Sequence, residues 1–524
     1  MTSPRIAIRN GFDRAERLLD RVFGPDWNPL AQLGPLGWFL FWIVAVTGIY
    51  LFIFFDTGVH AAYESVEWLT EDHWWHAGVA RSLHRYASDL MVLMMFTHLL
   101  REWSMDRYRG KRWFSWVTGV VVIWFVYLSG ITGYWLVWDE LAQYVAVVST
   151  ELLDTLGIFA EPIARNFLSP QMLSSRFFTL MVFLHIAIPL LLLLLMWVHI
   201  QRITEARTKP PKGLALITLG GLVVGSLILP ATSQGPADLA TVPRDVGIDW
   251  FLLSLYPVIE SVPAGAIWAG VAGFTVLMAG LPWLPRRREG AAAEVFLDHC
   301  NGCSRCVADC PYAAITLVPR TDDLPFTHEA LVDPARCVSC GICMGSCPSS
   351  TPFRRSGALV TGIDLPERPL SQVRAEVIAA AGMPAPGTGR VLTLSCAHGA
   401  GAAEAPGRVV LPCVAMAPPS LIDYIISRGL ADGVAVAGCA ERDCYNRFGV
   451  AWTEARFDRT RDPYLRERVP RERLLTVWAG PTEKVRLAGE LKAFSDRLGA
   501  MPGFENVRPL TAEEAAEAVQ EAAQ

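Results

Sequence analysis

The chain has 524 residues, of which 52% are hydrophobic and 19% are charged, and its formal net charge is −5. This charge gives no reason to expect a nucleic-acid partner, and the crowding of apolar residues into the first 285 positions excludes a simple soluble protein. None of the 12 cysteines precedes Cys300, so the two halves of the chain differ in chemistry as well as in polarity.

The N-terminal segment, residues 1–35, is polar, arginine-rich and amphipathic. It lacks the short apolar core and the small-residue cleavage site of a signal peptide. We expect a helix from Arg5 to Phe23 that lies on the membrane surface, with a soluble N-terminal arm as the alternative.

Six segments are long and apolar enough to cross a bilayer. They lie at residues 36–55, 79–100, 114–138, 177–200, 214–230 and 264–284. The second contains Arg81, Arg85 and Asp89 and is therefore the least apolar. Basic loops precede the first span and follow the second, fourth and sixth, so the positive-inside rule places both ends of the chain in the cytoplasm.

Two histidine pairs with the same spacing lie inside these spans: His84 and His98 in the second, His185 and His199 in the fourth. Fourteen residues are just under four helical turns, so each pair returns to one face about 21 Å apart. Parallel helices would pair His84 with His185 near the outer side and His98 with His199 near the inner side, as axial ligands of two haems. Hydrogen bonding between helices is the alternative for a single membrane histidine.

Four glycines repeat this spacing, since Gly34 and Gly48 bracket the first span and Gly119 and Gly133 lie in the third. A residue without a side chain allows a flat macrocycle to approach the backbone closely. Ordinary helix packing is the alternative.

Residues 30–285 resemble cytochrome b of the quinol:cytochrome c oxidoreductases. The matching stretches are Arg81-Ser-Leu-His84, His98 followed by Arg101, Gly133-Tyr-Trp-Leu-Val-Trp, His185-Ile-Ala-Ile-Pro and Val198-His199. The resemblance implies two b haems, a dimer, and pairing of Arg81 and Arg101 with haem propionates. Snorkelling at the interface is the alternative for both arginines.

The loop between the fifth and sixth spans departs from this family. It reads Gly247-Ile-Asp249-Trp250-Phe251 where the family carries Pro-Glu-Trp-Tyr at its outer quinol site. Asp249 and Trp250 are therefore candidate catalytic residues of an outer quinone site that is altered or silent, because the carboxylate is one methylene shorter. Asp249 as a mere interfacial acid is the alternative. On the inner side Thr204 replaces a histidine common in the family, so quinone contacts there cannot be carried over.

Two C-x2-C-x2-C-x3-C-P runs follow the last span. They place cysteines at 300, 303, 306 and 310, and at 337, 340, 343 and 347. In bacterial two-cluster ferredoxins the fourth cysteine of each run serves the other cluster. We therefore expect one 4Fe-4S cluster on Cys300, Cys303, Cys306 and Cys347, and a second on Cys337, Cys340, Cys343 and Cys310. Zinc and disulfides are the alternatives, and neither suits this spacing in a cytoplasmic domain.

Residues 388–500 read as an α/β module. Strands at Val391–Leu394, Arg408–Leu411 and from Gly433 each lead to a cysteine, and helix is expected from Ile422 to Ser427. Cys396, Cys413, Cys439 and Cys444 would then meet at the carboxyl ends of the strands and suit a 2Fe-2S cluster. Structural thiols and zinc are the alternatives.

This module resembles the small iron–sulfur delta subunit of the hydrogenases that work with heterodisulfide reductase. The resemblance rests on Leu394-Ser-Cys396, Leu411-Pro-Cys413, and Ala431 to Cys439 continuing through Asp443-Cys444-Tyr445. The family often has a further cysteine where Gly399 stands. The resemblance also implies that the module hands electrons to a flavoprotein.

The predicted protein is multidomain. It comprises a surface helix at 1–35, an all-α six-helix transmembrane cytochrome b core at 36–285, a linker at 286–294, a small α+β ferredoxin fold at 295–360, an α/β iron–sulfur domain at 388–500 and a tail at 501–524. The sequence carries no nucleotide or flavin fingerprint, so we expect a partner protein to oxidise the primary substrate.

We expect a multi-pass subunit of the prokaryotic cytoplasmic membrane that exchanges electrons with a cytoplasmic flavin-dependent dehydrogenase or hydrogenase and with the quinone pool. The cofactors would be one 2Fe-2S cluster, two 4Fe-4S clusters and two b haems. A passive electron-transfer anchor without a quinone site is one alternative. Quinol oxidation that drives electrons to a low-potential cytoplasmic acceptor is another.

Overall fold

The computed structural model describes residues 4–167, 173–243, 245–284, 290–351, 359, 361–381 and 389–523. Residues 286–289 of the predicted linker lie outside this part of the chain. The chain divides into two compact units, one of Met1–Gln201 and Ala206–Arg286 and one of Arg202–Glu205 and Arg287–Gln524.

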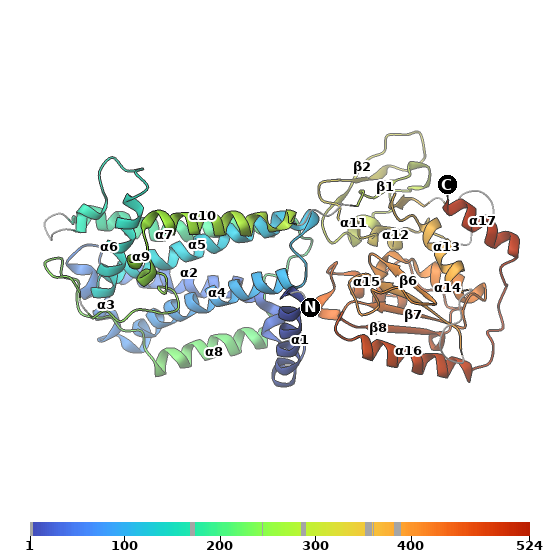
Figure 1. Cartoon of the computed structure of the whole chain (residues 1–524), viewed down its shortest axis with the longest axis horizontal. Helices are drawn as coiled ribbons and strands as arrows, with labels where there is room; N and C mark the ends of the chain where they lie inside the picture. Colours follow the sequence, from blue (N-terminus) through green and yellow to red (C-terminus); the bar gives the residue numbers. More distant parts are fainter. Residues whose placement is uncertain are drawn as a thin grey trace. The chain divides into compact units, whose positions relative to one another are not determined.

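The first unit is helical (Figure 1). Its helices are α1 (Pro4–Phe23), α2 (Leu33–Phe54), α3 (Ala61–Thr70), α4 (Val79–Ser104), α5 (Trp113–Val137), α6 (Glu140–Asp154), α7 (Ser175–His199), α8 (Lys212–Ile228), α9 (Tyr256–Ser261) and α10 (Ala264–Gly280). Each of the six predicted spans coincides with one of them, namely α2, α4, α5, α7, α8 and α10. Within the unit, α2 packs on α4 and α5 packs on α7.

Four helical stretches of this unit have the length and hydropathy needed to cross a membrane: Pro29–Phe54, Gly110–Val137, Phe178–His199 and Ala264–Trp283. Helix α8 is apolar but shorter. Helix α4 has 26 residues but carries Arg81, Arg85 and Asp89, so length and hydropathy alone do not single it out. Large apolar side chains such as Phe183, Leu190 and Trp197 of α7 are exposed, as expected of helices that face lipid.

The second unit begins with two short antiparallel ladders. Strand β1 (Glu294–Val295) pairs with β4 (Ile363–Asp364), and β2 (Ile315–Pro319) pairs with β3 (His328–Val332). The short helices α11 (Arg305–Asp309) and α12 (Ile342–Ser346) each lie within one cysteine run. This part therefore contains both strands and short helices.

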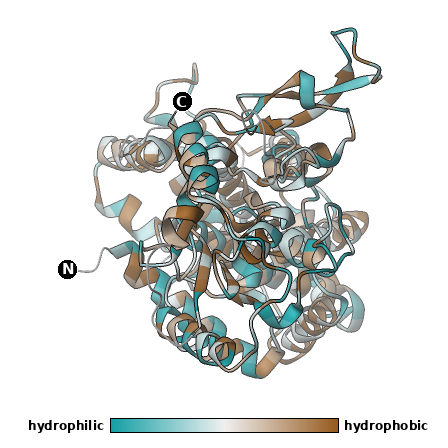
Figure 2. Cartoon of the chain, turned by 90° about the vertical axis from the view of Figure 1, so that its right-hand side faces the viewer, coloured by the Kyte–Doolittle hydropathy of each residue, from teal (hydrophilic) through white to brown (hydrophobic). Residues whose placement is uncertain are grey.

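A four-stranded parallel sheet forms the rest of the second unit, with the order β6-β5-β7-β8. The strands are β5 (Val391–Cys396), β6 (Arg408–Leu411), β7 (Gly433–Gly438) and β8 (Leu474–Trp478). The accompanying helices are α13 (Leu370–Ala381), α14 (Pro419–Ser427), α15 (Gly449–Phe457), α16 (Lys484–Gly499) and α17 (Ala512–Ala522). In Figure 2 the helices at the surface carry both hydrophilic and hydrophobic residues. This is expected of a helix that turns one face to the core and the other to solvent.

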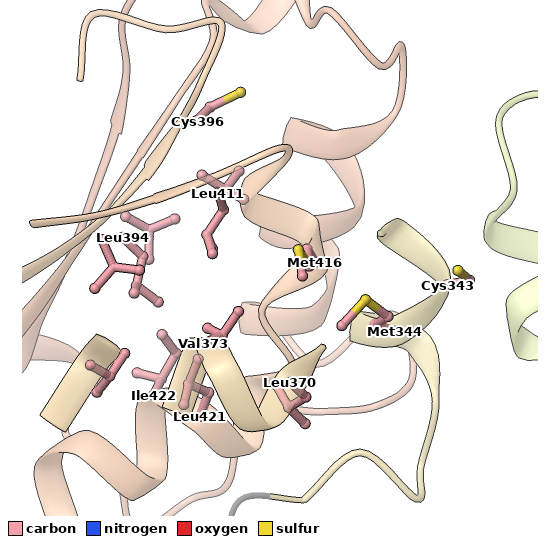
Figure 3. Close-up of a cluster of buried hydrophobic side chains, with 14 of the residues drawn as sticks. Cys343, Met344, Leu370, Val373, Leu394, Cys396, Leu411, Met416, Leu421 and Ile422 are labelled. Atoms are coloured by element: carbon pink, nitrogen blue, oxygen red, sulfur yellow. The ribbon is translucent and has the colours of Figure 1, made fainter. Parts of the chain in front are cut away.

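The ladders and the parallel sheet share one hydrophobic core (Figure 3). Met344 of α12 is fully buried beside Met416, and the same cluster contains Leu394 and Leu411 of the sheet. Fully burying a side chain of this size contributes about 1.5–3 kcal/mol. The two cysteine-bearing modules are therefore joined by packing as well as by the chain.

Candidate functional site

The outer histidine pair is brought together by α4 and α7. The ring centroids of His84 and His185 lie 6.3 Å apart. His84 Nδ1 is 3.0 Å from the carbonyl oxygen of Val44 and 3.2 Å from Thr47 Oγ1, both on α2. Because Nδ1 is engaged by the neighbouring helix, Nε2 is the nitrogen left to bind a metal, as in many ligating histidines. This arrangement fits a haem ligand.

His185 and His199 of α7 are anchored in the same way by α5. Thr132 Oγ1 is 3.1 Å from His185 Nδ1, and Thr118 Oγ1 is 3.0 Å from His199 Nδ1. His98 lies within electrostatic range of His199. The structure thus brings together both histidine pairs in the combination that the sequence predicts.

Three of the four glycines make room for an imidazole. A Cβ atom on Gly48 would lie 2.9 Å from His84 Cε1, one on Gly133 would lie 3.0 Å from His185 Cε1, and one on Gly119 would lie 3.2 Å from His199 Cε1. No heavy atom lies within 4 Å of such a position on Gly34. The neighbouring histidine ring thus explains why these three positions are glycine. The close approach of a macrocycle to these glycines stays a prediction.

Sequence reasoning missed the three threonines that hold the imidazoles. Thr47, Thr118 and Thr132 each stand directly before one of the three glycines that contact a histidine. A Thr-Gly dipeptide repeated at the haem spacing is the signal that points to them.

Both arginines expected to bind propionates have partners within the protein. Arg81 donates to Thr70 Oγ1 at 2.5 Å and to Ser233 Oγ at 2.8 Å. Arg101 is 5% exposed and forms a salt bridge of 2.8 Å with the equally buried Glu16 of α1. Propionate binding by these arginines stays a prediction.

Asp249 belongs to a polar cluster within the first unit. Arg85 donates to Asp249 Oδ2 at 2.7 Å and to Asp89 Oδ2 at 3.1 Å, so one guanidinium bridges two carboxylates. The Tyr134 hydroxyl donates to the same oxygen of Asp249, and the Arg85 guanidinium lies 4.7 Å from the centre of the Tyr134 ring. Trp250, the other predicted residue, is 70% exposed.

The two cysteine runs form two separate cavities. One is lined by Cys300, Cys303, Cys306 and Cys347, and the other by Cys310, Cys337, Cys340 and Cys343. Each cavity therefore gathers three cysteines of one run and the last cysteine of the other, as predicted for two 4Fe-4S clusters.

The backbone around these cavities suits an anionic cluster. In each run the residues before and after the second cysteine have a positive φ, namely Gly302 and Ser304 in the first and Ser339 and Gly341 in the second. Such left-handed turns direct successive amide groups inward, as in many iron–sulfur sites. Amides also donate to sulfur directly, from Ala314 to Cys310 Sγ at 3.4 Å and from Ala293 to Cys337 Sγ at 3.5 Å.

The four remaining cysteines converge at the carboxyl end of the parallel sheet, where Cys396 pairs in register with Leu411. The sulfur atoms of Cys396 and Cys439 are 3.4 Å apart. A Cβ atom on Gly449 would collide with Cys413 Sγ and lie 3.3 Å from Cys444 Sγ. All four thiols are buried, and all twelve cysteines are free.

The surroundings of these thiols keep them protonated when no metal is bound. Burial raises the pKa of Cys413 well above its ordinary value, and the hydrogen bond shared with Cys396 raises the pKa of Cys439 to about 12. Such thiols stay neutral and inert unless a metal stabilises the thiolates. Among the residues that the structure describes, no three His, Cys, Asp or Glu side chains are placed to hold a single metal ion.

Two further contacts within the second unit involve these cysteine sites. Cys340 of the second cavity packs against a small buried cluster formed by Ile342, Cys413 and Ala415. Thr204, which belongs to this unit, donates from its amide to the Pro311 carbonyl at 3.1 Å and from its hydroxyl to the Cys310 carbonyl at 3.0 Å. The sequence predicts only that Thr204 replaces a family histidine and does not predict these hydrogen bonds.

Three known protein families match separate parts of the chain. Residues 21–207 match cytochrome b/b6/petB, residues 299–351 match a 4Fe-4S dicluster domain, and residues 401–501 match the delta subunit of methyl-viologen-reducing hydrogenase. The matches confirm the predicted three-part fusion. The first ends before α8, and the third begins after Cys396.

Comparisons with whole proteins also cover about half of the chain. Cytochrome b of Acanthamoeba castellanii is 24% identical over 304 residues, which cover 51% of this chain and 76% of that protein. A chain of the hyperthermophilic respiratory Complex III is similar with a TM-score of 0.39 and 20% identity, over 48% of this chain and 74% of that one. The cytochrome b match implies haem and the dicluster match implies 4Fe-4S clusters, so this is a membrane electron-transfer protein.

Proposed function

We propose that the chain carries electrons between a cytoplasmic redox partner and the quinone pool, through one 2Fe-2S cluster, two 4Fe-4S clusters and two b haems. The observation that supports the proposal is the packing of Cys340 against the cluster that contains Cys413, because these cysteines belong to two different predicted iron–sulfur sites. A flavin-dependent dehydrogenase or a hydrogenase would exchange electrons with the delta-subunit-like module. Both chain ends and the iron–sulfur modules would be cytoplasmic, and the resemblance to cytochrome b favours a dimer.

The contacts favour a definite order of the centres. The 2Fe-2S cluster on Cys396, Cys413, Cys439 and Cys444 would be followed by the 4Fe-4S cluster on Cys310, Cys337, Cys340 and Cys343. Beside this second site, Thr204 donates hydrogen bonds to the carbonyls of Cys310 and Pro311. Five residues before Thr204 stands His199, the proposed ligand of the inner haem.

The other 4Fe-4S cluster would lie off this route. Its site is lined by Cys300, Cys303, Cys306 and Cys347, and Cys303 is exposed. We propose that it stores an electron or exchanges electrons with a partner at the surface.

Quinone chemistry at the outer end of the route would use Asp249. Arg85 directly follows His84 and binds Asp249, and Tyr134 directly follows Gly133 and donates to the same carboxylate oxygen. Oxidation of a quinol releases protons, and a carboxylate at the quinone site can accept one as a general base. We therefore propose for Asp249 the role of proton acceptor that the sequence suggests.

The test uses the full chain with its cofactors, in lipid nanodiscs and without oxygen. A reduced viologen added to the cytoplasmic modules should reduce the clusters, then the haems, and then a soluble quinone analogue. Cys413→Ser is expected to slow haem reduction by the viologen, while haem reduction by added quinol is unchanged. Haem reduction by viologen at the same rate in both proteins would contradict the route.

The same experiment separates the alternatives. Reduced haems without quinone turnover would identify a passive anchor. Spectroelectrochemical titration of all centres gives the direction of flow, since haems at lower potential than the clusters would favour quinol oxidation that drives electrons to a cytoplasmic acceptor.

A further inference from the structure

A buried arginine lies between the two adjacent iron–sulfur sites. Arg456 of α15 is 1% exposed. It donates to the Ala415 carbonyl at 2.8 Å and to Asp309 Oδ2 at 2.5 Å, and its second terminal nitrogen is 3.5 Å from the Ile342 carbonyl. Asp309 precedes Cys310, Ile342 precedes Cys343, and Ala415 follows Cys413 by two residues. One guanidinium thus contacts three segments that carry proposed cluster ligands.

The backbone contact at this place leaves no room for a side chain. A Cβ atom on Gly345 of α12 would overlap the Ala415 carbonyl oxygen and would lie 2.6 Å from a terminal nitrogen of Arg456. Helix α12 and the turn η7 (Val414–Met416) therefore touch through their backbones. The arginine lies at the edge of this contact and fixes it by hydrogen bonds to both sides.

The charges around Arg456 do not cancel. Asp309 is 2% exposed and is shared with Arg461, whose Nε donates to Asp309 Oδ1 at 2.6 Å. Two cations thus surround one buried carboxylate, and Arg456 is within electrostatic range of Cys413. A buried ion pair of this kind is weak evidence for stability, because desolvation of the charges offsets their attraction. Stability alone therefore does not account for Arg456.

We propose that Arg456 is a positioning residue whose charge raises the reduction potentials of the 2Fe-2S cluster and the adjacent 4Fe-4S cluster. Reduction adds one electron, and hence one negative charge, to a cluster without making or breaking a bond to Arg456. A positive charge in a buried site of low dielectric stabilises that reduced state. The inference rests on the proposed function only in that it requires both clusters to be bound.

The test is an EPR-monitored redox titration of the purified full chain with its clusters bound. Arg456→Gln should lower the midpoint potentials of both clusters, because the cation is lost. Asp309→Asn should raise both potentials, because a negative charge is lost between two arginines. We expect each change to alter the ratio of oxidised to reduced cluster at fixed potential at least tenfold, which is about 59 mV for one electron.

Two further variants separate charge from structure. Arg456→Lys keeps the charge and should hold the potentials near those of the wild type. Arg486→Gln removes an arginine from the surface of α16, where its side chain is 49% exposed, and should leave both potentials unchanged. Shifts of the same sign in Arg456→Gln and Asp309→Asn, or no shift in either, would overturn the proposal.

Iron content and visible spectra show whether each variant retains its clusters. If Arg456→Gln loses its clusters, the other two variants decide. Raised cluster potentials in Asp309→Asn together with near-normal potentials in Arg456→Lys support the proposal, and any other result refutes it. Because neither quinone nor a partner is present, the outcome is independent of quinone turnover. A wild-type protein that binds the clusters but reduces no quinone would remove the proposed function and leave this inference standing.

Discussion

At the scale of single residues, the carboxylate at the outer end of the proposed route makes a sharp prediction. Asp249→Asn removes the proton acceptor but keeps the size of the side chain and its place beside Arg85. A general base contributes about 10²–10⁴-fold to rate, so quinone turnover with a viologen donor should fall at least about 100-fold.

The controls for Asp249 use the same assay. Asp249→Glu keeps a carboxylate and should retain most of the turnover, and the haem spectra of both variants should match the wild type. Unchanged turnover in Asp249→Asn would mean that quinone reacts at another place, for example at the inner face.

A second residue-scale prediction concerns the threonine behind His185. Thr132→Val removes the hydroxyl that is 3.1 Å from His185 Nδ1 and keeps the shape of the side chain. Loss of such an outer-shell partner typically costs 10- to 100-fold in metal affinity, so the outer haem should dissociate more readily. Thr132→Ser retains the hydroxyl and is the control. The measurement is the transfer of haem to apomyoglobin after dilution. If both variants retain the same amount of haem, the hydroxyl contributes nothing to haem binding.

Residue types and spacing predicted the ligands of the candidate site better than its supporting residues. The cysteine runs gather as predicted because their spacing is set by the geometry of one cluster. Arg85, in contrast, stands 164 residues before Asp249, and no spacing rule relates a residue of a span to a residue of a distant loop. Trp250 was predicted from its neighbour in a motif, yet its side chain is exposed.

At the scale of elements, the fit of one helix against another makes the next prediction. A Cβ atom on Gly133 of α5 would lie 3.0 Å from the His185 ring of α7, which is closer than ordinary contact. Gly133→Ala should therefore displace the ring, at a cost of about 1–3 kcal/mol, and weaken binding of the outer haem. The pyridine haemochrome assay should count fewer haems per chain than in the wild type.

The matched control is another glycine of the predicted set. Gly34→Ala meets no heavy atom within 4 Å, so its haem content should equal that of the wild type. If both alanine variants bind the same amount of haem, the imidazole contact does not matter for binding.

Most of the elements could be predicted from the sequence because each carries its own local signal. The spans are long apolar runs, and α4, which its charges exclude from a stricter hydropathy criterion, was predicted as the least apolar of them. The cysteines at the carboxyl ends of parallel strands follow from the general geometry of such sheets. The packing of α12 against η7 depends on long-range complementarity at Gly345, which has no such local signal.

At the scale of the whole molecule, the shared core makes the ferredoxin and α/β modules dependent on each other. Cys310 and Cys343 of one module and Cys396 and Cys439 of the other are buried in the same hydrophobic cluster. A buried cysteine that loses its metal leaves an unfilled site, and metal binding free energy is folding free energy. The clusters and the core should therefore be lost together.

This dependence predicts a single unfolding transition for the second unit. In anaerobic urea titrations of the full chain, the visible absorption of the iron–sulfur clusters and the EPR signal of the 2Fe-2S cluster should disappear at one midpoint. The haem absorption, which reports the first unit, should follow its own midpoint. Gly345→Ala, which forces α12 away from the Ala415 carbonyl, should split the iron–sulfur transition into two. Two separate iron–sulfur midpoints already in the wild type would show that the modules fold independently despite their common core.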